Sequence, residues 1–288
     1  MPDDYNAIAD RAFPAFRRSM LSILTRYREG LPLADIEALV AGGYGVRSYM
    51  DRLSLRHDEN LEELRERLSS VFLKSMNAEA KRLAPSLKFA DAFATINEEA
   101  VLFLQRYSGL LLDSLEASVR ETVRDILIRG QREGTPVRLQ AKAIADAIGL
   151  TPRQSISVLN IQNTAYQAAI DAGKTIGQAE AIAAKASAAA SKRALLYRAT
   201  NIARTETLRA ANFGQLAVWE QYQREGLLPA NATKVWIVTP DDRLCVKICR
   251  PMDGVEALVT GDFETPAGAM RMPPAHASCR CAAAIGRA

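Results

Sequence analysis

Cysteine is absent from the first 244 residues of this 288-residue chain, and histidine occurs only twice. No apolar run approaches the ~20 residues that a membrane-spanning helix needs, so we expect no contact with a membrane. The acidic start MPDD lacks the basic and apolar segments of a signal peptide, so we expect a protein of a reducing compartment. The surplus of positive charge, 37 Lys and Arg against 33 Asp and Glu, is too small to indicate a nucleic-acid partner.

Catalytic signatures are missing as well. The sequence contains no Gly-rich phosphate loop, no G-x-S-x-G nucleophile motif and no H-E-x-x-H metal motif. Hydrophobic residues make up 48% and charged residues 24% of the chain, proportions that are ordinary for a globular protein. We therefore expect a globular protein that is not an enzyme.

The first part of the chain has the pattern of helices. From residue 1 to about 225, apolar residues recur at intervals of three and four, which is typical of amphipathic helices. The pairs Thr135-Pro136 and Thr151-Pro152 are typical helix starts. Residues 165–195 are rich in alanine and poor in large apolar groups, which predicts a long, slender helical segment that packs through small residues or lies partly exposed.

The pattern changes after Gly226. Residues 234–239 (KVWIVT) are β-branched and aromatic, and Pro240 follows, which predicts a strand that ends in a turn. The remaining segments are short, punctuated by glycine and proline, and poor in bulky apolar groups. Units this small are often stapled by a metal or by disulfides. The predicted fold class is a mainly α N-terminal two-thirds with a small C-terminal α+β unit, stapled by zinc or a disulfide. We expect three regions, over residues 1–134, 135–226 and 227–288.

All four cysteines lie in this C-terminal unit, together with one of the two histidines. Cys245 and Cys249 are spaced C-x3-C, and His276, Cys279 and Cys281 follow after 26 residues. Soft ligands at this density favour a structural zinc site, which takes four ligands. One of the five is therefore spare, and the spacing does not identify it. The alternatives are a disulfide, or small buried thiols with neither metal nor disulfide.

The last predicted helix carries a second group of polar residues. Arg204 and Glu206 lie close together, and Asn212 follows six residues after Glu206. We interpret these three as structural, because a buried Arg or Glu needs hydrogen-bond partners such as the backbone of an adjacent loop. One face of this helix is shared by Asn201, Thr205, Leu208 and Asn212. A catalytic role for Glu206 is disfavoured, because no histidine or second carboxylate motif accompanies it.

Seven short motifs follow one another in order between residues 203 and 281. They are Ala203-Arg204-Thr205-Glu206, Asn212-x-Gly214, Lys234-x-Trp236, Asp241-Asp242, Cys245-x3-Cys249, Met252-Asp253-Gly254 and Pro273-Pro274-x-His276-x2-Cys279-Arg280-Cys281. In this order they resemble the phage head morphogenesis family, also called the Mu F-like minor head proteins. The resemblance covers roughly residues 135–285. One departure is Ala277, where the family usually has proline after the histidine.

This resemblance implies a structural protein of a phage virion. Family members associate with the portal and act in head assembly and genome packaging or delivery. The implied location is the virion head, with assembly in the host cytoplasm. The implied partners are the portal protein, the major capsid protein or both, with weak contact with packaged DNA left open. Residues 1–134 would dock to the particle, and part of the apolar surface around Phe13, Phe16, Leu64, Phe72 and Leu104 is expected to remain free for this purpose.

Two other functions use the same residues differently. In an ADP-ribosyl transferase-like or nuclease effector, Arg204 and Glu206 would be catalytic, and replacing Glu206 by Gln would abolish turnover. In a zinc-stapled DNA-binding module, DNA affinity would fall steeply with salt, because phosphate contacts release counterions. A portal gene immediately upstream would favour the head protein over both.

Overall fold

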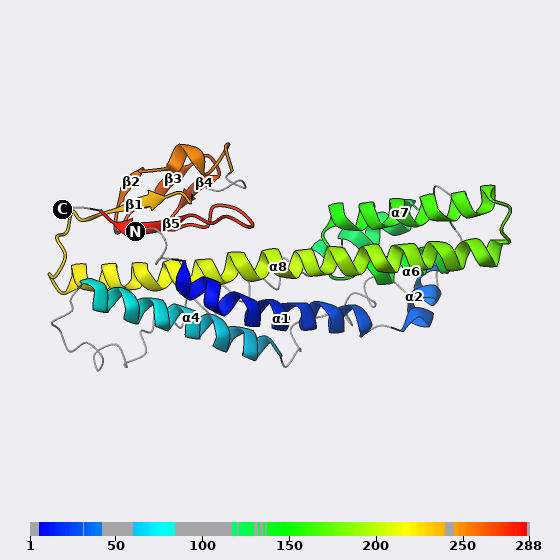
Figure 1. Cartoon of the computed structure of the whole chain (residues 1–288), viewed down its shortest axis with the longest axis horizontal. Coiled ribbons are helices and arrows are strands. Elements are labelled where there is room, and N and C mark those ends of the chain that lie inside the picture. The colour runs from blue at the N-terminus through cyan, green and yellow to red at the C-terminus, as the bar shows by residue number, and fades with distance from the viewer. Residues whose placement is uncertain are drawn as a thin grey trace. The chain divides into compact units, whose positions relative to one another are not determined.

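The protein is mainly helical in its first two-thirds and ends in a small unit that contains strands (Figure 1). This computed structural model describes residues 6–30, 32–41, 60–83, 117–119, 121–129, 132, 135, 137–239 and 245–286. The predicted fold class is confirmed. Among the helices of these described ranges, none combines the length and the apolar content that crossing a bilayer requires.

The helices begin and end largely where local sequence signals predict. They include α1 (Ala7–Glu29), α2 (Leu33–Val40), α4 (Asn60–Leu83), α6 (Val137–Ala147), α7 (Pro152–Asp171) and α8 (Ile176–Arg224), and residues 121–129 are also helical. At the start of α7, the Thr151 hydroxyl accepts a hydrogen bond from the Gln154 backbone N–H. The Gln154 side chain accepts the Thr151 N–H in return, so two otherwise unpaired donors are satisfied. The alanine-rich stretch lies mostly in α8, which has 49 residues.

The chain forms two compact units, and neither is a continuous stretch of sequence. Unit 1 comprises residues 1–19, 62–107 and 201–288, and unit 2 comprises residues 20–61 and 108–200. Boundaries fall inside α1, after the second residue of α4 and inside α8, so each of these helices contributes residues to both units. The three regions expected from the sequence are divided where its composition changes. The two units are instead defined by which residues contact one another, so the two divisions differ.

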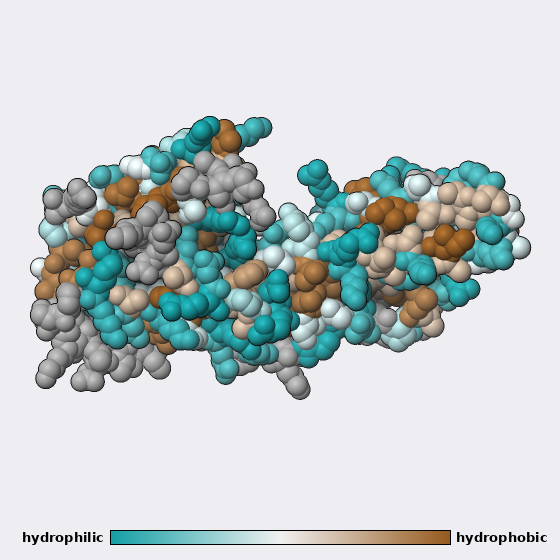
Figure 2. Space-filling model, in the orientation of Figure 1, coloured by the Kyte–Doolittle hydropathy of each residue, from teal (hydrophilic) through white to brown (hydrophobic). Residues whose placement is uncertain are grey.

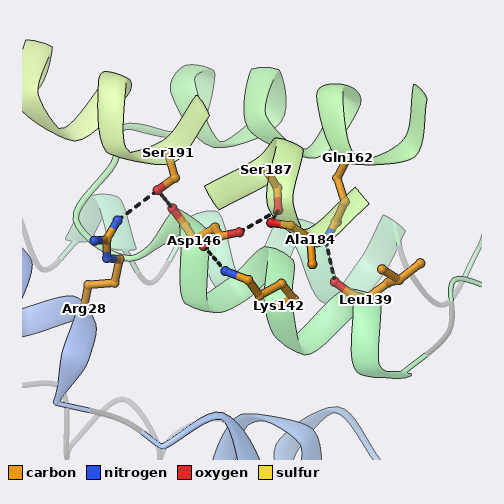
Figure 3. Close-up of polar contacts among 8 residues, drawn as sticks. All are labelled: Arg28, Leu139, Lys142, Asp146, Gln162, Ala184, Ser187 and Ser191. Atoms are coloured by element: carbon orange, nitrogen blue, oxygen red, sulfur yellow. Dashed lines mark hydrogen bonds and ion pairs between the residues drawn. The ribbon is translucent and has the colours of Figure 1, made fainter. Parts of the chain in front are cut away.

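Buried polar side chains connect α6 to α8 in unit 2 (Figure 3). The buried carboxylate of Asp146 accepts a hydrogen bond from Ser187 at 2.7 Å and pairs with Lys142 one turn away. Ser191 donates to the backbone carbonyl of Asp146 and accepts a hydrogen bond from Arg28 of α1. A buried carboxylate without such partners would be costly, so this network lets α6 and α8 pack closely around a charge.

Small residues allow the same close packing. Ala179, Ala183 and Ala190 of α8 are buried. Gly149, which follows α6, has a φ of +82°, a conformation that favours glycine, and a Cβ there would lie 3.0 Å from the Leu195 side chain. The buried alanines agree with packing through small residues, and the exposed Ile176 and Ile182 show that the same stretch also lies partly exposed.

In unit 1, α4 packs against the C-terminal part of α8. A Cβ at Gly214 would lie 2.5 Å from the carbonyl oxygen of Phe72, so glycine permits the close approach of the two helices. The indole N–H of the fully buried Trp219 donates to Glu79 at 2.7 Å. These contacts fix the part of α8 that carries Arg204, Glu206 and Asn212.

The strands of unit 1 form two small antiparallel sheets. The first has the order β2-β1-β5, with β1 (Thr233–Ile237) in the centre between β2 (Glu256–Leu258) and β5 (Ala282–Ile285). The second is the hairpin of β3 (Phe263–Thr265) and β4 (Gly268–Met270). The rings of Trp236 and Phe263 meet edge to face, with centroids 5.1 Å apart, at the centre of the core. Trp219, Met252, Val259, Met272 and Ala283 complete this core.

The apolar residues that were expected to remain free for a partner are mostly buried. Phe16, Leu64 and Phe72 are each at most 5% exposed, whereas Phe13 is half-buried and Leu104 lies outside the described residues. Leu73, next to Phe72 on α4, is 42% exposed. Figure 2 shows apolar groups scattered among hydrophilic ones on the face that it draws. On α7 and the first part of α8, the exposed large apolar residues are Ile156, Ile161, Ile176, Ile182, Leu196 and Tyr197.

Candidate metal centre

The five predicted ligands come together in unit 1, although 26 residues separate the first pair from the rest. Cys245 and Cys249 lie just before the short 3-10 helix η3 (Arg250–Met252), and the other three lie in the loop that leads into β5. The ligand atoms form two overlapping groups, Cys245 with Cys249 and His276, and Cys249 with Cys279 and Cys281. Within each group all ligand atoms lie within 4.8 Å of one another. The cluster could therefore hold a metal ion.

Cys249 is the centre of the cluster. Its sulfur lies 2.9 Å from Nε2 of His276 and 3.7 Å from the sulfur of Cys279. Two sulfurs bound to one tetrahedral zinc ion lie about 3.8 Å apart, whereas the sulfurs of a disulfide lie at about 2.05 Å. All four cysteines are free. The spacing of Cys249 and Cys279 thus matches two ligands of one ion, and the structure contains no disulfide among these residues.

The imidazole of His276 is oriented for ligation. Its Nδ1 lies 2.8 Å from the carbonyl oxygen of Ala277, and because a carbonyl only accepts, Nδ1 carries the proton. In a neutral ring this leaves the lone pair on Nε2, the atom that points at Cys249. A second nitrogen fixed in this way is typical of metal-binding histidines. Ala277, the residue that departs from the family pattern, supplies the carbonyl oxygen that orients the His276 ring.

Hydrogen bonds and burial set the pKa values of the four thiols. A hydrogen bond from the Cys281 thiol is the main cause that lowers the pKa of Cys279, and the same bond is the main cause that raises the pKa of Cys281. Burial raises the pKa of Cys249. The backbone N–H of Ile248 is the main cause that lowers the pKa of Cys245. Several thiolates this close together repel one another, and a bound cation would remove that cost.

Helix α8 holds the ligand loop in place. Asn212 is fully buried, and its amide nitrogen donates to the carbonyls of Pro273 at 3.0 Å and Cys281 at 3.4 Å. The backbone N–H of Ser278 donates to the Thr205 hydroxyl at 2.9 Å, and the Ser278 hydroxyl donates to Asn201 at 2.7 Å. Asn201, Thr205 and Asn212 therefore hold the two ends and the middle of this loop. Their shared helix face was the sequence signal for this contact.

Arg204 and Glu206 lie in different surroundings. The Arg204 guanidinium lies over the ring of Phe13, 5.1 Å from its centroid, and lines a cavity of about 190 Å³. Glu206 is buried, and its carboxylate lies 3.9 Å from the guanidinium of Arg209. Glu206 is not among the described residues that line this cavity. Asp241 and Asp242, the fourth of the seven motifs, lie outside the described residues.

Sequence reasoning missed the role of Lys234. This lysine of β1 is fully buried, and its ammonium donates to the carbonyls of Val259 at 3.2 Å and Gly261 at 2.7 Å. Burial is the main cause that lowers its pKa to about 8. The available signal was strand alternation, because Lys234 lies two residues from Trp236 and so on the same, buried face.

Comparison with models of known protein families gives no match, and neither curated proteins nor solved structures give one. The resemblance to phage head morphogenesis proteins therefore rests on the sequence motifs alone. No family is assigned to the chain on that basis.

Proposed function

We propose that this protein is a structural, portal-associated minor head protein of a phage particle, which acts in head assembly and genome packaging or delivery. The main support is that the motifs of the resemblance gather in one compact unit. They are spread from residue 203 to residue 281, yet Thr205 and Asn212 contact the loop that carries His276, Cys279 and Cys281. Motifs that contact one another in this way are expected when they define one structural module.

The polar residues of this module join segments of the chain. Asn201, Thr205 and Asn212 bind the ligand loop, and Glu206 pairs with Arg209 on its own helix. An effector enzyme would need Arg204 and Glu206 to face one substrate. That arrangement has no support among the described residues, because only Arg204 lines the adjoining cavity. The Glu206→Gln variant should accordingly lose some stability and retain particle assembly.

We also propose that the Cys/His cluster binds zinc and that the ion is structural. Thiolate and imidazole ligands suit zinc, and a site closed by four protein ligands leaves no open position for catalysis. The ion would join the segment around Cys249 to the loop before β5, two segments that lie far apart in the sequence. Ion binding and folding of the C-terminal unit would then be coupled.

The zinc proposal is tested by the metal content of the purified protein. Protein prepared under reducing conditions should contain about one zinc ion per chain, as expected of a structural site with one set of four ligands. Metal-free protein with four titratable thiols and an unchanged melting temperature would rule the ion out.

The head function is tested with the particle itself. A tagged chain is produced during particle assembly, and heads are separated from free protein by gradient sedimentation. We expect the chain to sediment with the heads, and we expect particles made without it to lose infectivity. A chain that remains entirely in the free fraction, with fully infectious particles in its absence, would reject the proposal. A portal gene immediately upstream would be independent support.

A further inference from the structure

We propose that Cys245, Cys249, His276 and Cys279 are the four metal ligands, and that Cys281 is a buried thiol outside the coordination sphere. This assignment rests on the proposed zinc site and names the spare residue that the spacing of the sequence leaves open. It predicts a site of three sulfurs and one nitrogen, to which each of two segments of the chain contributes two ligands.

Three of the four ligands follow from the first group. Cys245, Cys249 and His276 present their ligand atoms within 4.8 Å of one another. The imidazole is already fixed by Ala277 with Nε2 directed at Cys249. Cys245 begins a tight turn, in which its carbonyl oxygen accepts the backbone N–H groups of Cys249 and Arg250 at 3.0 Å. These three residues therefore present one set of ligand atoms from the two segments that the ion would join.

The fourth ligand is Cys279 or Cys281, since both lie near Cys249. Cys279 is 3.7 Å from the Cys249 sulfur, the separation expected between two ligands of one zinc ion. Its sulfur also accepts the backbone N–H of Cys281 at 3.4 Å, and this kind of bond favours a negatively charged sulfur. Cys279 therefore completes the set of four, next to Cys249, the residue that the two groups share.

Cys281 belongs to the other side of the cluster. Its sulfur lies within 4.8 Å of the sulfurs of Cys249 and Cys279, in a group that contains neither Cys245 nor His276. It immediately precedes β5, which pairs with β1, the strand that carries the fully buried Trp236. The backbone N–H of Cys281 donates to the Cys279 sulfur at 3.4 Å. Cys281 therefore orients the ligand Cys279 through a hydrogen bond, as groups around metal ligands commonly do.

The test compares Cys281→Ala with Cys279→Ala in the full chain, with Co²⁺ as a spectroscopic probe and zinc affinity as a second measurement. For the wild type we expect d–d bands of a tetrahedral site and charge-transfer intensity of three thiolates. Cys281→Ala should keep the band positions and intensity and lose at most about 10-fold to 100-fold in zinc affinity, the range for groups around a ligand. Cys279→Ala should lose one thiolate from the spectrum and more affinity than Cys281→Ala.

Each outcome of these measurements either supports or overturns the ligand assignment. A wild type that binds neither metal would reject the zinc site itself, independently of the head function. Loss of one thiolate band in Cys281→Ala, or an unchanged spectrum in Cys279→Ala, would overturn the ligand assignment while leaving the zinc site standing. If Cys279→Ala does not fold, as judged by its circular dichroism, the Cys281→Ala spectrum decides alone, because the proposal requires that spectrum to be unchanged.

Discussion

Asn212 connects α8 to both ends of the loop that carries His276, Cys279 and Cys281. Its amide nitrogen donates to Pro273 before the loop and to Cys281 at its end, and the side chain is fully buried. Without this amide, two carbonyl oxygens inside the protein lose a donor that water cannot easily replace. Asn212 is thus the one of the three helix residues that holds both ends of the loop.

We expect Asn212→Ala to lower the free energy of unfolding by about 1–3 kcal/mol, the usual cost of leaving buried polar groups unpaired. Urea denaturation followed by circular dichroism measures it. Gln221→Ala is the matched control, because the Gln221 amide is exposed and bonds only to Glu225 on the same helix. Equal losses in the two variants would contradict the proposed role of Asn212.

Lys234 makes the stability of unit 1 depend on pH. Its pKa is about 8 in the folded chain and 10.5 as a reference, and the main cause is burial. Below about pH 8 the Lys234 side chain is protonated in both the folded and the unfolded chain. The folded chain then bears the full free-energy cost of a buried ammonium group. Between these two values the unfolded chain binds more protons, so stability rises with pH.

Comparison of the wild type with Lys234→Met isolates this effect, because other titrating groups are common to both proteins. We expect the wild type to gain stability relative to the variant as the pH rises from 7 to 10, measured by urea denaturation at each pH. A difference in unfolding free energy that does not vary over this window would show that Lys234 keeps an ordinary pKa.

At the scale of elements, the contact of α4 with α8 depends on the absence of a side chain at Gly214. A methyl group there would meet the Phe72 carbonyl oxygen at 2.5 Å, and backbone cannot move aside as a flexible side chain can. We expect Gly214→Ala to cost about 1–3 kcal/mol through displacement of the helices. Gly177→Ala in the same helix is the control, since nothing lies within 4 Å of its added methyl group. Thermal denaturation should show a lower melting temperature for the first variant only.

Local elements were predictable from the sequence because their signals are local. The capping residue Thr151 and Pro152 mark the start of α7, and the β-branched run after Thr233 marks β1. The grouping of the Cys and His residues was also predictable, because cysteine and histidine side chains at this density commonly come together around one structural ion. Which polar residue faces which loop was less accessible. The pairing of Ser278 with Asn201 spans 77 residues, and no local pattern encodes a contact of that range.

Burial was the other property that local patterns did not reveal. Phe16 and Phe72 are apolar and evenly spaced whether they face a partner protein or the interior, and only the complete fold places them inside. Lys234 shows the opposite case, because a charged side chain in a strand predicts a solvated position. Two backbone carbonyls and the ring of Phe263, all distant in sequence, make its burial tolerable.

At the scale of the whole molecule, the proposed ion should stabilise one region selectively. Treatment with a chelator under reducing conditions should make residues 227–286 sensitive to proteases, because folding of that region is coupled to ion binding. The helices of unit 2, which contain no ligand, should remain protected. Limited proteolysis followed by mass spectrometry locates the cuts, and chelator saturated with zinc is the control. Identical digestion with and without the chelator would count against a structural ion.

The composition of unit 1 has a consequence for the order in which a ribosome produces the protein. Residues 60–83 of α4 leave the ribosome well before the part of α8 that begins at residue 201, to which they bind. At typical rates of synthesis the interval is roughly ten seconds. During that time Phe72 and Met76, which are buried in the finished protein, have no α8 to cover them. The nascent chain is therefore expected to need a chaperone, or another temporary cover for α4, until the last third is made.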